Sequence, residues 1–350
     1  MLWLPASCRS APQSPEKEDI PHEVQAEDIT EAELEEELPE ETEPDLPEMD
    51  IADLPVSSFK EIWAYVIDGR EQFLKADYPI TDVGYFGAEI DAYGHLTGVP
   101  NPRKIAFFPG RKHMVVACNG RALTHFVLEP DSHTRRRIIA SLLEAAAGFD
   151  GLQIDFEQVP ARDGAAFLSF LAELREKLRG KIFTIALAAR SRTLENDVYD
   201  YRKILPLVDR ILVMAYDEHW STSAPGPIAS MAWCRRVAAY ALETAGAGKL
   251  IMGLPFYGRT WGSANVFQAY IYSSIQRIIA ENKVTEIRRE GGIPTFTYQI
   301  PLTVTAYYED AYSLAMRLNM YRTMGVRAVG FWRVGQETPA VWKLLQLTTE

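Results

Sequence analysis

The sequence lacks the features that mark several classes of protein. Its 350 residues include only three cysteines, too few for the disulfide framework of a small secreted domain. No stretch approaches the ~20 consecutive apolar residues that span a bilayer. A Gly-rich phosphate-binding turn, a His/Cys/carboxylate cluster with metal spacing and basic–aromatic interleaving are also missing. We therefore expect no cofactor, no metal and no nucleic-acid partner, and we expect Cys118 and Cys234 to be buried thiols.

Acidic charge is concentrated near the N-terminus. Residues 11–55 contain 18 Asp and Glu residues and one lysine, so the remainder of this chain of net charge −12 sums to +5. The segment is Pro-rich, has no aromatic residue and repels itself. We interpret residues 1–56 as a disordered acidic leader and residues 57–350 as the folded unit.

Cys8 offers two interpretations. It follows Leu-Pro-Ala-Ser at residues 4–7, which resembles a loose bacterial lipobox, and a long spacer follows it. Seven preceding residues are too few for a signal peptide. Either Cys8 is lipidated, which implies membrane attachment and an extracytoplasmic protein of the cell envelope, or it is incidental and the protein can be cytoplasmic. A basic and then apolar segment encoded upstream in frame would decide between them.

Strand-like and helix-like patterns alternate along residues 57–350. Strands are expected at 61–67, 82–90, 113–118, 151–157, 182–189, 210–216, 249–256 and 327–333. Helices are expected near 70–77, 133–147, 161–179, 199–206, 230–246 and 311–324. Eight strands alternating with helices predict an α/β fold, the (β/α)8 TIM barrel, with a doubly wound sheet as the alternative.

Two connections depart from a plain barrel. Residues 91–112 form an irregular loop with Gly and Pro where a helix is expected. Residues 258–306, between the seventh and eighth strands, hold a helix-like stretch at 267–282, a basic strand-like stretch at 283–289 and a strand candidate at 294–299. We interpret them as a small α+β insertion that either deepens a ligand groove or only stabilises the barrel.

Residues 149–157, Phe-Asp-Gly-Leu-Gln-Ile-Asp-Phe-Glu, carry the most informative pattern. Side chains of a strand alternate between its faces, so Gln153, Asp155 and Glu157 share one face and apolar side chains share the other. Helical patterns on both sides predict that both faces are covered. A barrel interior, near the C-terminal end where barrel enzymes place their active sites, accommodates the two carboxylates.

The spacing of this pair limits the chemistry. Cα atoms two residues apart on a strand are ~6.6 Å apart and lie side by side. Two carboxylates so placed cannot readily flank a scissile bond as an ordinary retaining pair does at ~5 Å. They can act in series, one as an acid with a raised pKa and the other by holding a second group in place.

Other strand ends add polar and aromatic groups that suit a sugar. These are Met-Ala-Tyr-Asp-Glu-His at 214–219, Leu-Pro-Phe-Tyr-Gly-Arg at 254–259 and Phe-Trp-Arg at 331–333. Aromatic faces stack on pyranose C–H surfaces, and carboxylates bind hydroxyls. His219 is expected to be a rim group and not a ligand.

Taken together, these motifs resemble glycoside hydrolase family 18, the chitinase-like barrels. Residues 149–157 are similar to the family signature Asp-Gly-x-Asp-x-Asp-x-Glu, and 214–217 and 253–259 are similar to its motifs on strands six and seven. The resemblance covers about 60–345. It implies substrate-assisted, retaining hydrolysis of an N-acetylglucosamine-containing polysaccharide.

The resemblance also implies the role of each residue. Glu157 would protonate the glycosidic oxygen, Asp155 would accept a hydrogen bond from the acetamido N–H, and Tyr216 would donate to the acetamido oxygen. The remaining expected substrate-binding residues are Gln153, Met214, Asp217, Tyr257, Arg259 and Trp332, the last as the floor of the central sugar site.

Two departures point to one branch of the family. Gln153 replaces the middle Asp of the signature; its amide can still hydrogen-bond Asp155, which should ionise more easily without the extra charge. The third strand ends Ala-Cys-Asn-Gly at 117–120, where chitinases commonly have Ser-x-Gly-Gly. Both features resemble the members that degrade spore-cortex peptidoglycan. A sugar-binding barrel without catalysis is the alternative function, we expect a monomer, and the choice between internal and terminal cleavage stays open.

Overall fold

The computed structural model describes residues 50–262, 269–299 and 303–348. The lipidation candidate Cys8 and nearly all of the acidic leader lie outside these residues. Within them, no helix combines the length and the apolar character needed to cross a membrane.

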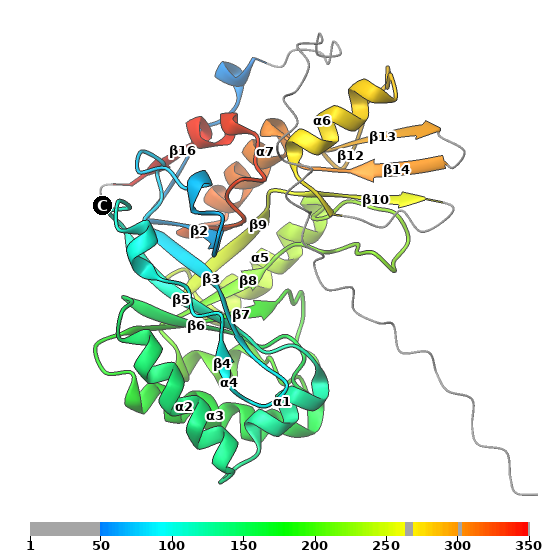
Figure 1. Cartoon of the computed structure of the whole chain (residues 1–350). Helices are drawn as coiled ribbons and strands as arrows, with labels where there is room; N and C mark the ends of the chain where they lie inside the picture. Colours follow the sequence, from blue (N-terminus) through cyan, green and yellow to red (C-terminus); the bar gives the residue numbers. More distant parts are fainter. Residues whose placement is uncertain (1–49, 263–268, 300–302, 349–350) are drawn as a thin grey trace, which may run out of the picture. The chain divides into compact units, whose positions relative to one another are not determined.

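Eight parallel strands within the described residues form a closed barrel (Figure 1). They are β2 (Glu61–Ile67), β3 (Asp82–Ile90), β5 (Arg111–Ala117), β6 (Gly151–Asp155), β7 (Ile182–Ala188), β8 (Arg210–Met214), β9 (Leu250–Pro255) and β15 (Ala328–Trp332). Each pairs with the next around the ring, and β2 pairs with both β3 and β15, which closes it. The prediction of a (β/α)8 barrel is confirmed.

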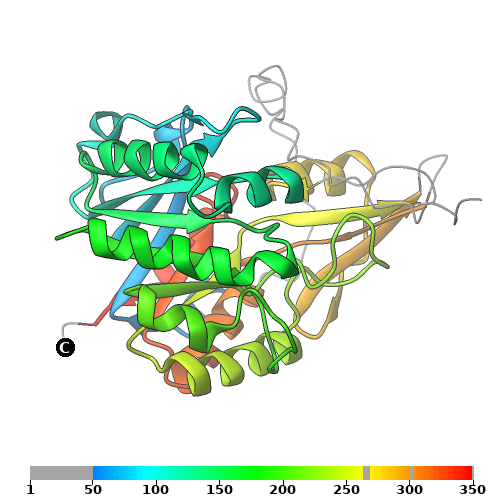
Figure 2. The same cartoon turned by 90° about the horizontal axis from the view of Figure 1, so that it is seen from below.

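Helices cover the outside of the barrel (Figure 2). They are α1 (Arg121–Leu128), α2 (His133–Ala146), α3 (Gly164–Lys177), α4 (Tyr201–Ile204), α5 (Met231–Ala245) and α7 (Ala311–Thr323). The sequence did not predict α1. The helix expected at 70–77 is wrong, because only a 3-10 turn forms at Glu71–Phe73. Leu74 is already extended and buried, and Pro79 disfavours a helical conformation in the residue before it.

The faces of β6 are used as its alternating pattern predicts. Leu152 and Ile154 lie in the main apolar core between strands and helices. Phe156, directly after the strand, joins that core by stacking on Phe170 of α3 with ring centroids 5.7 Å apart. Gln153 lies on the opposite face and is fully buried inside the barrel.

The insertion between β9 and β15 is a second, five-stranded antiparallel sheet with one helix. Its parts are β10 (Gly258–Gly262), β11 (Ala269–Tyr270), α6 (Tyr272–Glu281), β12 (Arg288–Glu290), β13 (Ile293–Gln299) and β14 (Thr303–Tyr307). Figure 2 shows it at the end toward which the barrel strands point. The expected α+β insertion is confirmed, although β12 covers only the end of the basic stretch.

The two ends of the described chain meet. Strand β1 (Ser57–Phe59) pairs in parallel with β16 (Leu345–Leu347). Just before β1, Leu54 packs against Ala315 of α7 and Leu344. Because β1 leads directly into β2, this small sheet lies at the N-terminal end of the barrel.

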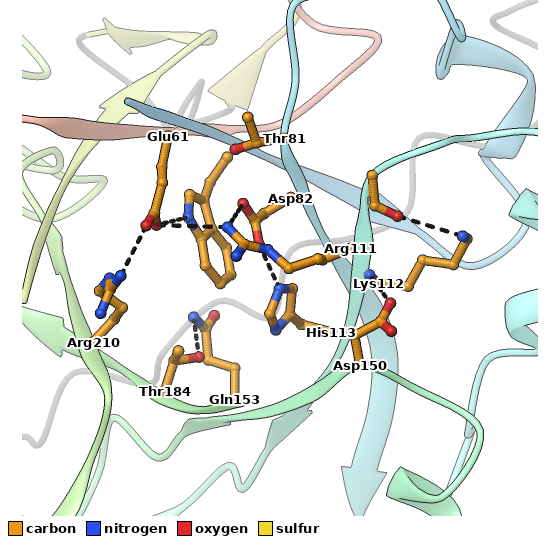
Figure 3. A network of polar contacts seen from close by, with 12 residues as sticks. Glu61, Thr81, Asp82, Arg111, Lys112, His113, Asp150, Gln153, Thr184 and Arg210 are labelled. Atoms are coloured by element: carbon orange, nitrogen blue, oxygen red, sulfur yellow. Dashed lines mark hydrogen bonds and ion pairs between the residues drawn. The ribbon is translucent and has the colours of Figure 1, made fainter. Parts of the chain in front are cut away.

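Charged side chains fill the N-terminal end of the barrel interior (Figure 3). Arg111 forms a two-pronged ion pair with Asp82, at 2.6 and 2.7 Å, and Nε2 of His113 lies 2.7 Å from the same carboxylate. Glu61 accepts from Arg210 at 2.8 Å. Although burial acts in the opposite direction, the bonds from His113 and Arg111 lower the pKa of Asp82 below its ordinary value.

This network generates a stability prediction. Asp82→Ala leaves the buried imidazole of His113 without its partner and removes the ion pair with the more exposed Arg111, so it should cost about 3 kcal/mol of unfolding free energy at neutral pH. Because the pKa of Asp82 is lowered in the folded state, its contribution is present above the unfolded pKa of ~3.9 and is lost as the pH falls. Urea unfolding at pH 7 and at acid pH measures this. Asp150→Ala, which removes an exposed carboxylate bonded to the N–H of Lys112, should cost about 1 kcal/mol or less.

Candidate active site

Asp155 is the last residue of β6 and lies at the inner end of the site. Its side chain points into the barrel and the residue is 8% exposed. Among the described residues, its buried Oδ1 atom has no hydrogen-bond partner. Burial, and then the negative charge of Glu157, raise the pKa of Asp155 well above its ordinary value. A buried acceptor of this kind is suited to a donor that arrives with a ligand.

Glu157 lies farther out than the sequence predicted. The strand ends at Asp155, and Glu157 occupies the turn that follows. Phe156 is anchored in the outer core, which directs the chain so that Glu157 is exposed at the C-terminal end of the barrel. The expected strand 151–157 is therefore two residues too long. The two carboxylates still interact, because the charge of Glu157 acts on Asp155.

The hydrogen bonds of Gln153 do not go to Asp155, as the sequence had suggested they could. Its amide nitrogen donates to Oγ1 of Thr184 at 3.1 Å, and its oxygen accepts from the hydroxyl of Tyr65. Thr184 comes from the neighbouring strand β7, whereas Tyr65 comes from β2, which does not pair with β6, so its side chain reaches Gln153 through the barrel interior. The amide is therefore satisfied within the protein and forms the floor of the site one layer below Asp155.

Tyr216 follows β8 and faces the same interior. Its ring contacts Tyr257 edge to face at 6.3 Å. Gly253 on β9 allows this position, since a Cβ there would come within 3.0 Å of the Tyr216 ring and 2.7 Å of the Val213 carbonyl oxygen. Burial, with further contributions from Tyr65, Tyr257 and the carboxylates of Asp155 and Glu157, raises the pKa of Tyr216 well above its ordinary value. The phenol therefore keeps its proton and can donate it to an acceptor.

Three of the expected sugar-binding residues form one polar cluster. Oδ1 of Asp217 accepts from the hydroxyl of Tyr257 at 2.6 Å and from Nη2 and Nε of Arg259 at 2.8 and 3.0 Å. Asp217 has φ = +57°, a left-handed conformation that Asp tolerates better than most residues. That turn directs its carboxylate from the β8 end toward the β9–β10 connection.

Trp332 lies at the end of β15, and its peptide bond to Arg333 is cis. Its ring contacts Tyr65 at 5.3 Å and meets Phe86 edge-on at 5.2 Å. Trp332 and Met214 are partly buried and pack on the apolar cluster inside the barrel, so each covers this cluster on its C-terminal side. Neither residue is fully buried.

His219 belongs to the loop and does not join the catalytic residues. Its Nδ1 lies 2.8 Å from the carbonyl oxygen of Pro227, so it braces the loop after β8. Cys118 and Cys234 are buried free thiols, as predicted.

The sequence did not point to Tyr65, Thr184 or Tyr199 as parts of the site. Tyr65 and Thr184 hold Gln153, and Tyr199 bonds the turn that carries Glu157. The period-two pattern of 61–67 already places Tyr65 on the face shared with Trp63. No comparable local pattern identifies Tyr199.

The model of Glycosyl hydrolases family 18 matches residues 117–337. The chain belongs to this family. The matched segment runs from the end of β5 to beyond β15 and so includes every candidate catalytic residue described above.

Individual relatives agree with this assignment. YdhD of Bacillus subtilis, named as a sporulation-specific glycosylase, is 30% identical over 219 residues, covering 59% of this chain and 52% of YdhD. The cortical fragment-lytic enzyme of Bacillus subtilis is 26% identical over 294 residues, covering 76% and 67%. The chain therefore spans about half to two thirds of the length of these relatives. The crystal structure of the Bacillus cereus spore cortex-lytic enzyme SleL superposes with a TM-score of 0.74 at 21% identity, covering 83% of this chain and 76% of SleL.

The raised pKa of Asp155 predicts that its ionised side chain lowers the stability of the fold. A folded-state pKa above the unfolded value means that ionisation destabilises the fold, so stability falls as the pH rises above ~3.9. Asp155→Asn should therefore raise Tm at neutral pH, by about 2 °C if the gain is ~1 kcal/mol, and should leave it unchanged at acid pH. Thermal unfolding across pH measures both.

Asp209 is the control, because its pKa is shifted in the opposite direction from that of Asp155. Burial acts to raise the pKa of Asp209, but hydrogen bonds from Arg175 and from the backbone N–H of Phe183 lower it overall. Asp209→Asn should lower Tm at neutral pH. A lower neutral-pH Tm for Asp155→Asn as well would contradict the assignment of a buried, destabilising charge.

Proposed function

We propose that this protein is a retaining β-N-acetylglucosaminide hydrolase that uses the acetamido group of its substrate as the nucleophile. Glu157 is the general acid and then the general base, Asp155 orients and stabilises the acetamido group, and Tyr216 donates to the acetamido oxygen. The observation that carries the proposal is the buried Oδ1 of Asp155, which has no donor among the described residues while a second carboxylate follows at the exposed end of the site.

The first step forms a ring and breaks the glycosidic bond. The acetamido carbonyl oxygen attacks the anomeric carbon, the proton of Glu157 moves to the leaving oxygen, and the sugar becomes an oxazolinium ion. Asp155 accepts a hydrogen bond from the acetamido N–H, and its negative charge stabilises the positive ring. Its dry surroundings strengthen that interaction relative to water.

The second step reverses the roles. Glu157, now ionised, removes a proton from water, and the oxygen of that water bonds to the anomeric carbon as the ring opens. Two displacements on one carbon give net retention of configuration. Side-by-side carboxylates are sufficient for this route because the substrate supplies the attacking atom.

Neighbouring sugars bind on the remaining groups. Trp332 and Met214 offer an apolar surface for the C–H face of a pyranose ring. The Asp217–Tyr257–Arg259 cluster presents oriented donors and a carboxylate beside that surface for sugar hydroxyl and carbonyl groups.

Peptidoglycan is the proposed substrate in preference to chitin. Gln153 and the Ala-Cys-Asn-Gly end of β5 resemble the cortex-degrading branch, and similarity to the cortical fragment-lytic enzyme and to SleL supports the same choice. An extracytoplasmic location in the cell envelope follows from such a substrate, and lipidation of Cys8 would retain the protein there.

The first test is Glu157→Gln, assayed on N-acetylglucosamine oligomers and on purified peptidoglycan. We expect hydrolysis with retention by the wild type and a loss of at least ~10²-fold in kcat by the variant, since the amide cannot supply the proton. Glu89→Gln, at an exposed carboxylate near the same end of the barrel, should retain activity. Equal turnover by wild type and Glu157→Gln rejects the proposal, and tight binding without turnover by both supports the alternative sugar-binding protein.

A second test changes the charge below Asp155. Gln153→Asp places another carboxylate in a fully buried position, which raises the pKa of Asp155 further. Because Asp155 must be ionised to stabilise the ring, the acidic limb of the kcat/KM profile should move to higher pH. Gln153→Asn, with the same length as Asp but no charge, should leave that limb in place. A shift of equal size in both variants would assign the effect to shape and not to charge.

A further inference from the structure

Tyr199 makes a contact that the family motifs do not include. It lies in the loop between β7 and α4, and its hydroxyl group reaches the turn that carries Glu157. The hydroxyl donates to the carbonyl oxygen of Phe156 at 2.7 Å and accepts from the N–H of Val159 at 2.8 Å. A single side chain therefore joins the residue before Glu157 to the chain two residues after it.

Both main-chain groups lie where water cannot easily replace the phenol. Phe156 is 1% exposed and Val159 is 5% exposed. A buried polar group that loses its partner costs about 1–3 kcal/mol, so the turn has a strong preference for the conformation that keeps both bonds. Glu157 takes its direction from this conformation, because it lies between the two bonded residues.

The tyrosine is itself held in place on three sides. Its ring meets Phe167 of α3 edge to face at 6.1 Å. Its backbone N–H donates to Asp197 at 3.1 Å, and Asp197 forms a two-pronged ion pair with Arg190 at 2.7 and 3.0 Å. The Arg190 guanidinium also lies 5.9 Å from the centre of the Tyr199 ring. The hydroxyl therefore has little freedom to follow a movement of the turn.

We propose that Tyr199 is a positioning residue that fixes the acid–base group Glu157 through the main chain on both sides of it. The inference rests on the acid–base role of Glu157 proposed above. Tyr199 transfers no proton in this scheme. Its hydroxyl is already committed as a donor and as an acceptor, and its effect on the reaction passes through the location of the Glu157 carboxyl group.

A positioning role has a kinetic signature that a structural role lacks. Misplacing a catalytic group by ~1 Å can cost ~10²-fold in rate. The cost applies to steps that need the proton of Glu157. Departure of a sugar alcohol needs that proton, whereas a dinitrophenolate leaves without one. Loosening the turn should therefore slow the cleavage of an oligosaccharide far more than that of an activated aryl glycoside.

The experiment compares Tyr199→Phe with the wild type on two substrates, an N-acetylglucosamine oligomer and the 2,4-dinitrophenyl glycoside of the N-acetylglucosamine dimer. For the oligomer we expect kcat to fall by ~10-fold or more with KM within ~2-fold, and for the aryl glycoside we expect kcat/KM within ~3-fold of wild type. Oligomer turnover within twofold of wild type, or equal losses on both substrates, would overturn the proposal.

Tyr201→Phe is the matched control. Tyr201 is also buried, and its hydroxyl donates to the carbonyl oxygen of Ala188 at 2.7 Å, so its loss removes the same kind of bond two residues away. This bond holds the end of β7 and not the turn of Glu157. We expect a lower Tm but no difference between the two substrates. A selective loss on the oligomer in this variant too would assign the effect to general loosening.

A double variant separates this inference from the function on which it rests. If Glu157→Gln leaves oligomer cleavage unchanged, the proposed function fails. If Glu157→Gln slows oligomer cleavage as expected, adding Tyr199→Phe should change its residual rate on the oligomer by less than ~2-fold, because residues that act as one unit are not additive. A further loss as large as in the wild-type background would show that Tyr199 acts independently of Glu157.

Asp197→Asn provides a second route if Tyr199→Phe does not fold. This substitution weakens the ion pair with Arg190 that holds the loop of Tyr199, and it retains the Tyr199 hydroxyl group. The same substrate-selective loss, smaller in size, supports the proposal, and equal losses on both substrates contradict it.

Discussion

Closure of the barrel is the constraint on which the site depends. A strand in a closed ring of eight sends every second side chain into a dry interior, and a polar side chain there must find partners or carry the cost of burial. Along β6 this cost changes with depth. Gln153 is neutral and hydrogen-bonded through both its amide oxygen and its amide nitrogen, and Asp155 keeps a buried oxygen without a donor. Glu157, just beyond the strand, reaches solvent. Strand β6 and the turn that follows it thus present a floor, a charge-stabilising group and an acid in order.

Below the apolar cluster on which Trp332 and Met214 pack, the N-terminal end of the barrel interior holds charged side chains. Buried carboxylates at the two ends of the barrel have different surroundings. At the N-terminal end, hydrogen bonds from His113 and Arg111 lower the pKa of Asp82 although its burial acts to raise it. At the C-terminal end, burial and a like charge raise the pKa of Asp155. The arrangement around Asp82 stabilises the fold. The arrangement around Asp155 lowers stability, and it leaves a buried carboxylate that a positively charged or hydrogen-bond-donating group of a ligand can stabilise.

The insertion is connected to the site through a short link. Strand β10 begins three residues after β9 ends, and Arg259 on it bonds Asp217, which follows β8. Tyr257 and Trp261 pack with Ile293 of β13 in an apolar cluster that Tyr216 and Trp332 also contact. The insertion and the barrel therefore share side chains around the sugar-binding residues.

Sequence reasoning succeeded where a pattern is local. Strands β2 and β3 have the predicted bounds, because an uninterrupted run with clear turn residues at both ends determines a strand. It was less accurate where pairing with a neighbouring strand sets the end of a strand. Strand β6 stops at Asp155 because its last partner on β5 is Ala117 and the chain then turns outward. The hydrogen-bond partners of Gln153 were mispredicted because Tyr65 and Thr184 are remote from it in the sequence. Tyr199 was missed for the same reason, as no periodicity links a loop tyrosine to a turn on another strand.

The pairing of β1 with β16 determines which end of the barrel is held when the protein is attached to a polymer, a surface or a fusion partner. The first and last strands of the described chain lie side by side at the end of the barrel opposite Glu157 and Asp217. A polymer, surface or fusion partner joined just before β1 or just after β16 would be attached at the N-terminal end of the barrel, with the sugar-binding end on the opposite side. Joining the termini to each other and opening the chain elsewhere should likewise preserve the ring of strands.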